Sequence, residues 1–187
     1  MPSLSESDHH ALLRLARQAV VEAVSQGHLP EQIPQDGVFA ERCGAFVTLH
    51  VRRRLRGCIG VIEGDEPLGE SIARCAASAA LQDPRFPPLC PADLDELHIE
   101  ISLLSPPAAI RPEQIEIGRH GLLVSRGAQR GLLLPQVATE HRLTREQFLE
   151  EACRKAQLAR QAWQECGTLI FGFTCEVFSE GSHVAEP

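Results

Sequence analysis

Hydrophobic residues recur along the chain with two different periods, and the periods predict where helices and strands lie. Between residues 7 and 25 the apolar positions are three or four apart, as on one face of an amphipathic helix. Further along, the period becomes two. This alternation predicts strands over 45–51 and 55–62, joined as a hairpin by a turn at Arg52-Arg53-Arg54.

The segment after this hairpin predicts a helix, a loop and a third strand. Residues 68–80 form a helical pattern whose apolar face is rich in alanine, which predicts close packing on a sheet. The three prolines of 83–88 end it, because proline cannot continue a helix. A short helix over 92–97 and a strand over 98–104 complete this part of the chain.

The C-terminal part repeats these patterns. Strands over 121–124 and 131–134 predict a second hairpin. A capping box that begins at Thr144 then opens a helix. A short helix over 159–163 follows, and one strand is predicted over 168–178.

The two parts have the same order of elements, which predicts an internal duplication. Residues 44–104 and 121–178 each run hairpin, helix, short helix, strand, and Arg56-Gly57-Cys58 matches Arg130-Gly131-Leu132. We therefore predict an α+β fold of antiparallel or mixed β-structure with flanking helices, built from a duplicated β-β-α-α-β unit. The whole chain, residues 1–187, is interpreted as one domain. Because Leu132 replaces Cys58 in the second copy, a thiol function would belong to the first half.

Composition excludes several classes of function. A net charge of −7 over 187 residues argues against a nucleic-acid binder driven by overall charge. No apolar run approaches the roughly 18–20 residues of a membrane span, and the polar start does not resemble a signal peptide. The seven cysteines contain no C-x-x-C pair. We expect a cytoplasmic protein in which most cysteines are small buried residues.

The strongest candidate for a catalytic or binding site is the stretch Leu55-Arg56-Gly57-Cys58-Ile59-Gly60. In a regular strand Leu55 and Ile59 would face the core, while Arg56 and Cys58 would share the other face. Gly57 would allow close approach of another backbone or a ligand. One interpretation is that Cys58 is a nucleophile or a covalent anchor. The alternative is that Cys58 is a small apolar residue packed under the alanine-rich helix.

A reactive thiolate needs a nearby cation. Arg56 is the first candidate, and Arg85 is a second if the Asp83-Pro84-Arg85-Phe86 loop lies beside the strand. Arg56, Gly57, Gly60 and Arg85 are accordingly the candidate binding residues for an anionic ligand.

A thiol nucleophile also needs a base. His120, at the start of the second hairpin, is one candidate, and Glu100, which shares a strand face with His98, is another. For each of these residues the alternative is a surface or structural role. Cys58, His98 and Glu100 are acceptable metal ligands, but no helical ligand pair marks a site, so we predict no metal and no cofactor.

At these residues the chain resembles the AMMECR-domain family over roughly residues 40–180. The motifs that carry the resemblance are Phe46-Val47-Thr48-Leu49, Leu55 to Gly60, Ala79-Ala80 with Asp83 to Phe86, Glu100-Ile101-Ser102, Gly118 to Val124 and Gly131 to Val137. The chain departs from the family at the arginine-rich hairpin turn, where a glycine-containing turn is usual, and at Gln157, where glycine is common. The resemblance implies a mixed α+β domain with a larger and a smaller part, and supplies no established reaction.

The resemblance also implies partners. Bacterial members belong to a three-protein set with a Memo-like protein and a radical S-adenosylmethionine (SAM) protein. We therefore hold two hypotheses. The first is an enzyme or enzyme component that uses Cys58 with Arg56 on a small anionic substrate. The second is a non-catalytic adaptor that presents this surface to one of those partners. Binding of nucleic acid through Arg52 to Arg54 is a third reading that we do not favour, because no aromatic residues are interleaved with the charges.

Overall fold

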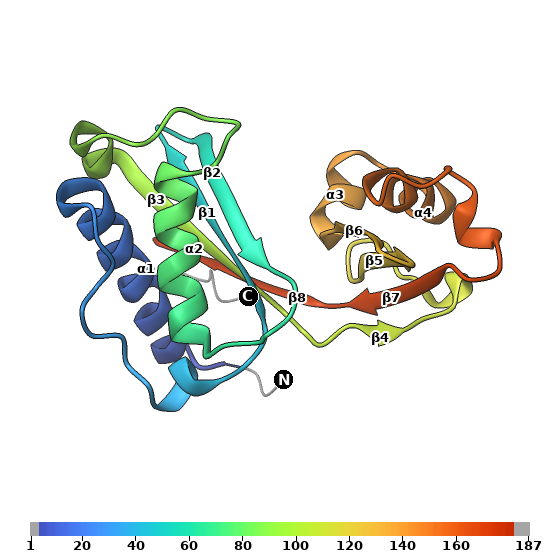
Figure 1. Cartoon of the computed structure of the whole chain (residues 1–187), viewed down its shortest axis with the longest axis horizontal. Helices are drawn as coiled ribbons and strands as arrows, with labels where there is room; N and C mark the ends of the chain where they lie inside the picture. The colour runs from blue at the N-terminus through green and yellow to red at the C-terminus, as the bar shows by residue number, and fades with distance from the viewer. Residues whose placement is uncertain (1–3, 182–187) are drawn as a thin grey trace, which may run out of the picture. The chain divides into compact units, whose positions relative to one another are not determined.

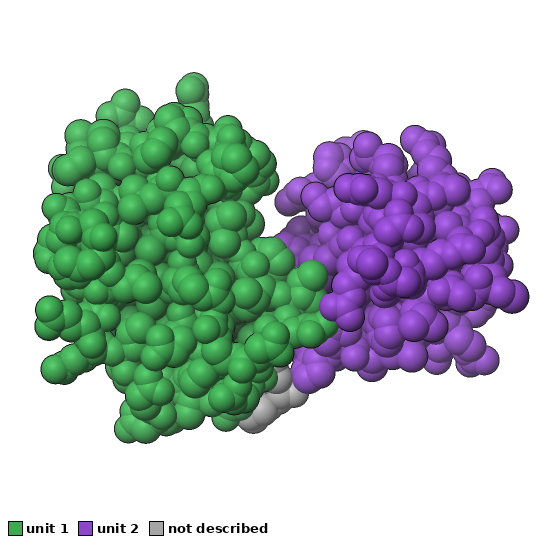
Figure 2. Space-filling model, viewed as in Figure 1, with its two compact units in different colours: residues 1–103, 176–187 green, residues 104–175 purple. Residues whose placement is uncertain are grey.

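The computed structural model describes residues 4–181, and the chain divides into two compact units (Figure 2). Unit 1 comprises residues 1–103 and 176–187, and unit 2 comprises residues 104–175. Each unit has its own hydrophobic core between a sheet and its helices. Within residues 4–181 no helix is long and apolar enough to cross a membrane.

Unit 1 is built on a four-stranded sheet, sheet 1, with both of its α-helices on one face (Figure 1). Its elements are α1 (Glu6–Gln26), β1 (Gly44–Val51), β2 (Arg54–Val61), α2 (Leu68–Leu81), β3 (Leu97–Leu104) and β8 (Cys175–Ser179). The strand order is β2-β1-β3-β8. The core lies between the helices and the sheet face that carries Val47, Leu49, Ile99 and Ile101. The short helix expected before β3 is a 3-10 helix, Pro91–Glu96.

Unit 2 repeats this plan on a smaller scale. Its elements are β4 (Ala108–Ala109), β5 (Gly121–Arg126), β6 (Gln129–Leu133), α3 (Pro135–Glu140), α4 (Arg145–Lys155) and β7 (Leu169–Phe173). The order in this sheet, sheet 2, is β4-β7-β5-β6, and every pair is antiparallel. The sequence did not predict α3, because six residues are too few to show a helical period. The short helix expected over 159–163 is a 3-10 helix, Ala162–Gln164.

The predicted α+β fold and its duplicated unit are confirmed. In each half the third strand lies beside the first strand of the hairpin, which gives β2-β1-β3 in one sheet and β6-β5-β7 in the other. The matched glycines of the two halves, Gly57 and Gly131, have the same structural role. A Cβ at Gly57 would lie 2.0 Å from the backbone oxygen of Ala79 in α2, and one at Gly131 would lie 2.3 Å from the backbone nitrogen of Ala156 at the end of α4. In both halves, glycine lets the helix backbone touch the strand.

The prediction of a single strand over 168–178 is wrong. The segment is divided at Thr174 into β7 and β8, which belong to different sheets. The chain also changes sheets after β3. That strand of sheet 1 ends at Leu104, and the next strand, β4, belongs to sheet 2. Apolar residues continue to alternate across Thr174, so the period of the sequence alone cannot show that the strand is divided there. Ser105 marks the division, because its N–H donates to the Thr174 carbonyl at 3.0 Å and its Oγ accepts from the Thr174 N–H at 2.9 Å.

The first hairpin contains a β-bulge that the regular alternation did not anticipate. Leu49 pairs with Gly57 but His50 pairs with Leu55, so Arg56 is the extra residue. Leu55 therefore lies 39% exposed instead of facing the core, whereas Ile59 packs against the core as expected.

The turn of this hairpin is strained. Arg52 and Arg53 have φ of 53° and 63°, in the left-handed region that glycine or asparagine usually occupies. Gln157 has φ of 59° as well. At both departures from the family pattern, a longer side chain thus adopts a conformation that favours glycine.

Candidate functional site

Cys58 lies on the face of sheet 1 opposite α1 and α2. Gly57, its neighbour in β2, is the residue that contacts α2, so Cys58 points the other way. The alternative in which Cys58 packs under the alanine-rich helix is therefore wrong. Cys58 pairs with Thr48 of β1, and the Thr48 hydroxyl donates to the Cys58 sulfur at 3.3 Å. Both side chains are half-buried.

The Asp83-Pro84-Arg85-Phe86 loop holds the backbone of Cys58 at the sheet edge. The Cys58 N–H donates to Asp83 Oδ2 at 2.9 Å, and Arg85 Nη2 donates to the Cys58 carbonyl at 3.1 Å. Because β2 is an edge strand, these groups would otherwise lack a ladder partner. The loop after α2 therefore fixes the position of Cys58.

Asp83 and Arg85 form a two-point ion pair beneath this contact. Arg85 Nε donates to Asp83 Oδ1 at 2.9 Å and Arg85 Nη2 to Oδ2 at 2.6 Å, while the Asp83 side chain is only 2% exposed. These bonds hold the pKa of Asp83 well below its usual range, against the opposing effect of burial. The carboxylate is therefore charged at neutral pH.

Arg85 is the cation beside the thiol. Hydrogen bonds to Asp83 are the main reason that its pKa is raised, and the charge and side chain of Cys58 raise it further. The guanidinium contacts the Cys58 residue through its backbone carbonyl. It also lies 5.3 Å from the ring centre of Phe86 and is half-exposed. Arg85, proposed from the sequence as the second cation, therefore lies beside Cys58 as that prediction required.

Arg56 is directed toward the segment that follows the loop. Its Nη2 contacts the Pro87 carbonyl at 3.4 Å and lies 3.9 Å from Asp93 Oδ2. Its Nε is buried and has no hydrogen-bond partner among the described residues. The bulge at this position removes Arg56 from the simple alternation that placed it beside Cys58.

The remaining candidates have separate surroundings. Gly60, two residues along β2, gives room for the Phe46 ring, since a Cβ there would lie 2.3 Å from that ring. Glu100 lies on β3, on the same sheet face as Cys58 but with β1 between their strands. His120 belongs to unit 2, where its Nδ1 accepts from the Glu116 N–H at 3.0 Å.

The chain is similar to known proteins over most of its length. The AMMECR1 family model matches residues 13–178. The chain belongs to the AMMECR1 family. It is 43% identical to a protein of Thermococcus gammatolerans, covering 90% of this chain and 88% of that protein. It is 44% identical to the protein MK0488 of Methanopyrus kandleri, covering 90% and 86%. The crystal structure of the uncharacterized protein PH0010 from Pyrococcus horikoshii matches at 38% identity with a TM-score of 0.85, covering 95% of this chain and 94% of that one.

Sequence reasoning missed one residue of this AMMECR1 site, Thr48. The residue belongs to the family motif Phe46-Val47-Thr48-Leu49, but its place opposite Cys58 depends on the hairpin register. The bulge sets that register, and no local sequence pattern predicts the bulge.

The cysteines of this AMMECR1 chain differ from the expectation that most are buried. Three are buried in the cores, Cys43, Cys75 and Cys153, while Cys90 and Cys166 are exposed. Burial raises the pKa of both Cys43 and Cys75 to about 11, so these thiols stay protonated at neutral pH. No group of three His, Cys, Asp or Glu side chains within residues 4–181 is placed to hold a metal ion.

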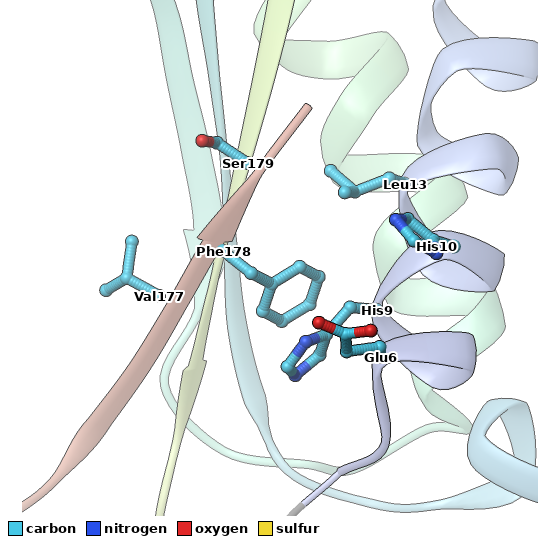
Figure 3. Close-up of a pocket in the computed structure, with 7 residues that line it drawn as sticks. All are labelled: Glu6, His9, His10, Leu13, Val177, Phe178 and Ser179. Atoms are coloured by element: carbon cyan, nitrogen blue, oxygen red, sulfur yellow. The ribbon is translucent and has the colours of Figure 1, made fainter. Parts of the chain in front are cut away.

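A separate pocket of about 190 Å³ lies between α1 and β8 of unit 1 (Figure 3). It is lined by Glu6, His9, His10, Leu13, Val177, Phe178 and Ser179. The His9 ring stacks on Phe178 with 4.1 Å between centroids, and its Nε2 lies 2.9 Å from Glu176 Oε1. About two turns further along α1, Arg17 Nε donates to Glu180 Oε1 at 2.6 Å. These contacts attach β8 to α1, so we assign them a structural role.

Proposed function

We propose that this AMMECR1 chain is an enzyme, or a component of an enzyme system, that uses the Cys58 thiolate as a nucleophile or covalent anchor on a small anionic substrate. The arrangement around the sulfur supports the proposal. The sulfur accepts a hydrogen bond from Thr48, and the Arg85 guanidinium donates to the backbone carbonyl of the same cysteine. A hydroxyl donor and a cation both stabilise a thiolate more than a thiol.

The surroundings of Arg56 support an anionic substrate. Its Nε is buried without a partner among the described residues, and its contact to Pro87 is long. The nearby Asp93 is already engaged, because it accepts from the Cys90 N–H at 2.9 Å. An arginine with unused donors is suited to bind a carboxylate or phosphate through two parallel hydrogen bonds.

Alkylation by reagents of different charge tests this role. We expect the native protein to show a higher ratio of iodoacetate to iodoacetamide reactivity at Cys58 than at the exposed Cys166. Replacing Arg56 by glutamine should lower the Cys58 ratio about fivefold, which corresponds to roughly 1 kcal/mol of charge interaction. Rates would be measured for each cysteine by mass spectrometry.

Arg53→Gln is the matched control. Arg53 lies exposed at the turn of the same hairpin, so this variant removes one positive charge without changing Arg56. If both variants lower the ratio equally, general surface charge is the cause, and the anion-binding role of Arg56 is rejected.

A non-catalytic adaptor is the second candidate. Leu55, in the same strand as Arg56 and Cys58, is a large apolar side chain that is 39% exposed. On this proposal the surface would bind a Memo-like or radical SAM protein. Such a partner would co-purify with wild type and with Cys58→Ser alike, and Leu55→Asp would weaken its binding. Loss of binding in Cys58→Ser alone would contradict a purely adaptor role.

A further inference from the structure

The two edge strands of sheet 1 differ in what lies beside them. The strand order β2-β1-β3-β8 makes β2 and β8 the edges. The outer side of β2 is occupied by the loop after α2, because Asp83 and Arg85 bond the backbone of Cys58. On the outer side of β8, no further strand is paired within residues 4–181. Since an edge strand is a template for another chain, β8 is the side of this sheet that can accept an added strand.

The bonds at the two ends of β8 show which of its backbone groups face outward. The Ser105 N–H donates to the Thr174 carbonyl at 3.0 Å. At the other end, the Glu180 N–H donates to the Ile99 carbonyl at 3.0 Å. The two pairs are antiparallel and equally spaced in both strands, and in such a ladder every second residue bonds to the same neighbour. The N–H and the carbonyl of Val177 therefore point away from β3, toward the open side.

The alternation of side chains along β8 directs an added strand toward the pocket between α1 and β8. Figure 3 shows the Phe178 ring directed toward α1 and the Val177 side chain directed away from it. Residues directly opposite each other on neighbouring strands have their side chains on the same face of the sheet. The residue of an added strand that lies across from Phe178 would thus direct its side chain to the α1 side, into this pocket.

The pocket selects the kind of side chain that it can hold. Its volume of about 190 Å³ is below the roughly 300 Å³ at which small-molecule sites begin, so it fits one amino-acid side chain. Leu13 and Phe178 are buried and supply apolar surface. Glu6 is exposed, and within residues 4–181 its carboxylate has no hydrogen bond or ion pair. A lysine or arginine side chain, with an apolar stem and a cationic head, satisfies both surfaces.

Contacts around the pocket hold α1 and β8 in a fixed arrangement. The His9 ring stacks on Phe178, and its Nε2 lies 2.9 Å from Glu176 Oε1. Further along α1, Arg17 donates to both carboxylate oxygens of Glu180, each at 2.6 Å. Because the pocket is formed before a ligand arrives, binding requires little ordering of the protein.

A second copy of this chain is a poorer occupant than a basic peptide. Its own β8 carries Glu176 and Phe178 on the face that would meet α1. A second Glu176 beside Glu6 would place like charges together, which is unfavourable. The second Phe178 is already buried in the core of its own unit. The charges therefore favour a different protein as the partner.

We infer that β8 binds an extended peptide segment of a partner protein by strand addition, with a lysine or arginine of that segment in the pocket between α1 and β8. Val177 exchanges backbone hydrogen bonds with the segment, and Glu6 pairs with the basic side chain. The site is independent of Cys58, so it stands or falls separately from the proposed nucleophilic function.

The experiment selects displayed random peptides on the native chain and measures binding of the best one by fluorescence anisotropy. We expect enriched peptides to share a lysine or arginine within an alternating, β-prone stretch. Val177→Pro removes the outward N–H, which an edge strand tolerates, and should weaken binding at least about tenfold. Val177→Ala keeps the N–H and should retain most of the affinity. Glu6→Gln should weaken binding about threefold, since its ion pair is exposed.

Glu31→Gln is the control for charge, because Glu31 is exposed beyond the other end of α1. If Val177→Pro does not fold, N-methylation of the peptide nitrogens tests the same backbone bonds in the wild-type protein. Absence of any enriched peptide, or equal affinity for wild type and Val177→Pro, would overturn the inference. So would equal effects of Glu6→Gln and Glu31→Gln. A wild-type dimer that Val177→Pro dissociates would reject a foreign peptide and assign this edge to a second copy.

Discussion

Replacing Gly57 by alanine will destabilise unit 1 by at least about 3 kcal/mol, because the added methyl group has no room. An ideal Cβ at Gly57 lies 2.0 Å from the Ala79 carbonyl oxygen and 2.8 Å from its carbon. These are helix backbone atoms, so no side-chain rotation relieves the overlap. The helix must move away from β2, and that shift disturbs the core between them. Denaturant unfolding of wild type and variant measures the loss.

Gly131 provides an internal test of the duplication. A Cβ there would lie 2.3 Å from the Ala156 nitrogen and 2.6 Å from the Ala152 oxygen. We expect Gly131→Ala to destabilise unit 2 for the same reason. Leu55→Ala is the control in the same strand as Gly57, and because Leu55 is partly exposed its effect should stay under about 1 kcal/mol. An unfolding midpoint of Gly57→Ala equal to that of wild type would refute close contact between strand and helix.

Replacing Asp83 by asparagine will lower the free energy of unfolding by about 2–3 kcal/mol at pH 7. The change removes a buried charge that Arg85 binds at two points and weakens the acceptor for the Cys58 N–H. Because Arg85 is half-exposed, water compensates part of the loss. Glu116→Gln is the control, since its pair with Arg119 is exposed on both sides and contributes under about 1 kcal/mol.

The stabilisation that the Asp83 carboxylate gives to the folded protein should decrease as the pH falls. The pKa of the folded carboxyl lies below that of the unfolded chain, about 3.9, so folding favours the ionised form. Its contribution is fully present above that value and is lost as pH falls toward the folded pKa. The stability difference between wild type and Asp83→Asn should therefore be constant from pH 5 to 7 and shrink below about pH 4. A difference that grows on acidification would contradict the ion pair.

Much of the fold follows from local patterns, because amphipathic periods report which face of an element is buried. Residues 7–25 and 68–80 predicted α1 and α2 closely, and the matched Arg-Gly dipeptides marked equivalent helix contacts. The passage of the chain from β7 to β8 was not predictable, because alternation is the same on both sides of Thr174. Choice of sheet is a tertiary property.

The candidate site was predictable only in part. Cys58 and the neighbouring loop stood out by residue type, and Arg85 was placed near the thiol. The direction of the Arg56 side chain, which reaches the Pro87 carbonyl, was not visible, because it depends on a single-residue bulge between Leu49 and His50. Thr48 was not identified from the sequence for the same reason, since a cross-strand partner is defined only once the register is known.

The most direct test compares iodoacetamide alkylation of Cys58 in the native chain and in the same chain unfolded by urea at neutral pH. Folding slows alkylation of a merely buried thiol, whereas a thiolate stabilised by Thr48 and Arg85 reacts faster when folded. We predict that native Cys58 reacts at least as fast as unfolded Cys58, while Cys75 becomes reactive only on unfolding. A native Cys58 that stays inert until the protein unfolds would contradict the nucleophilic role.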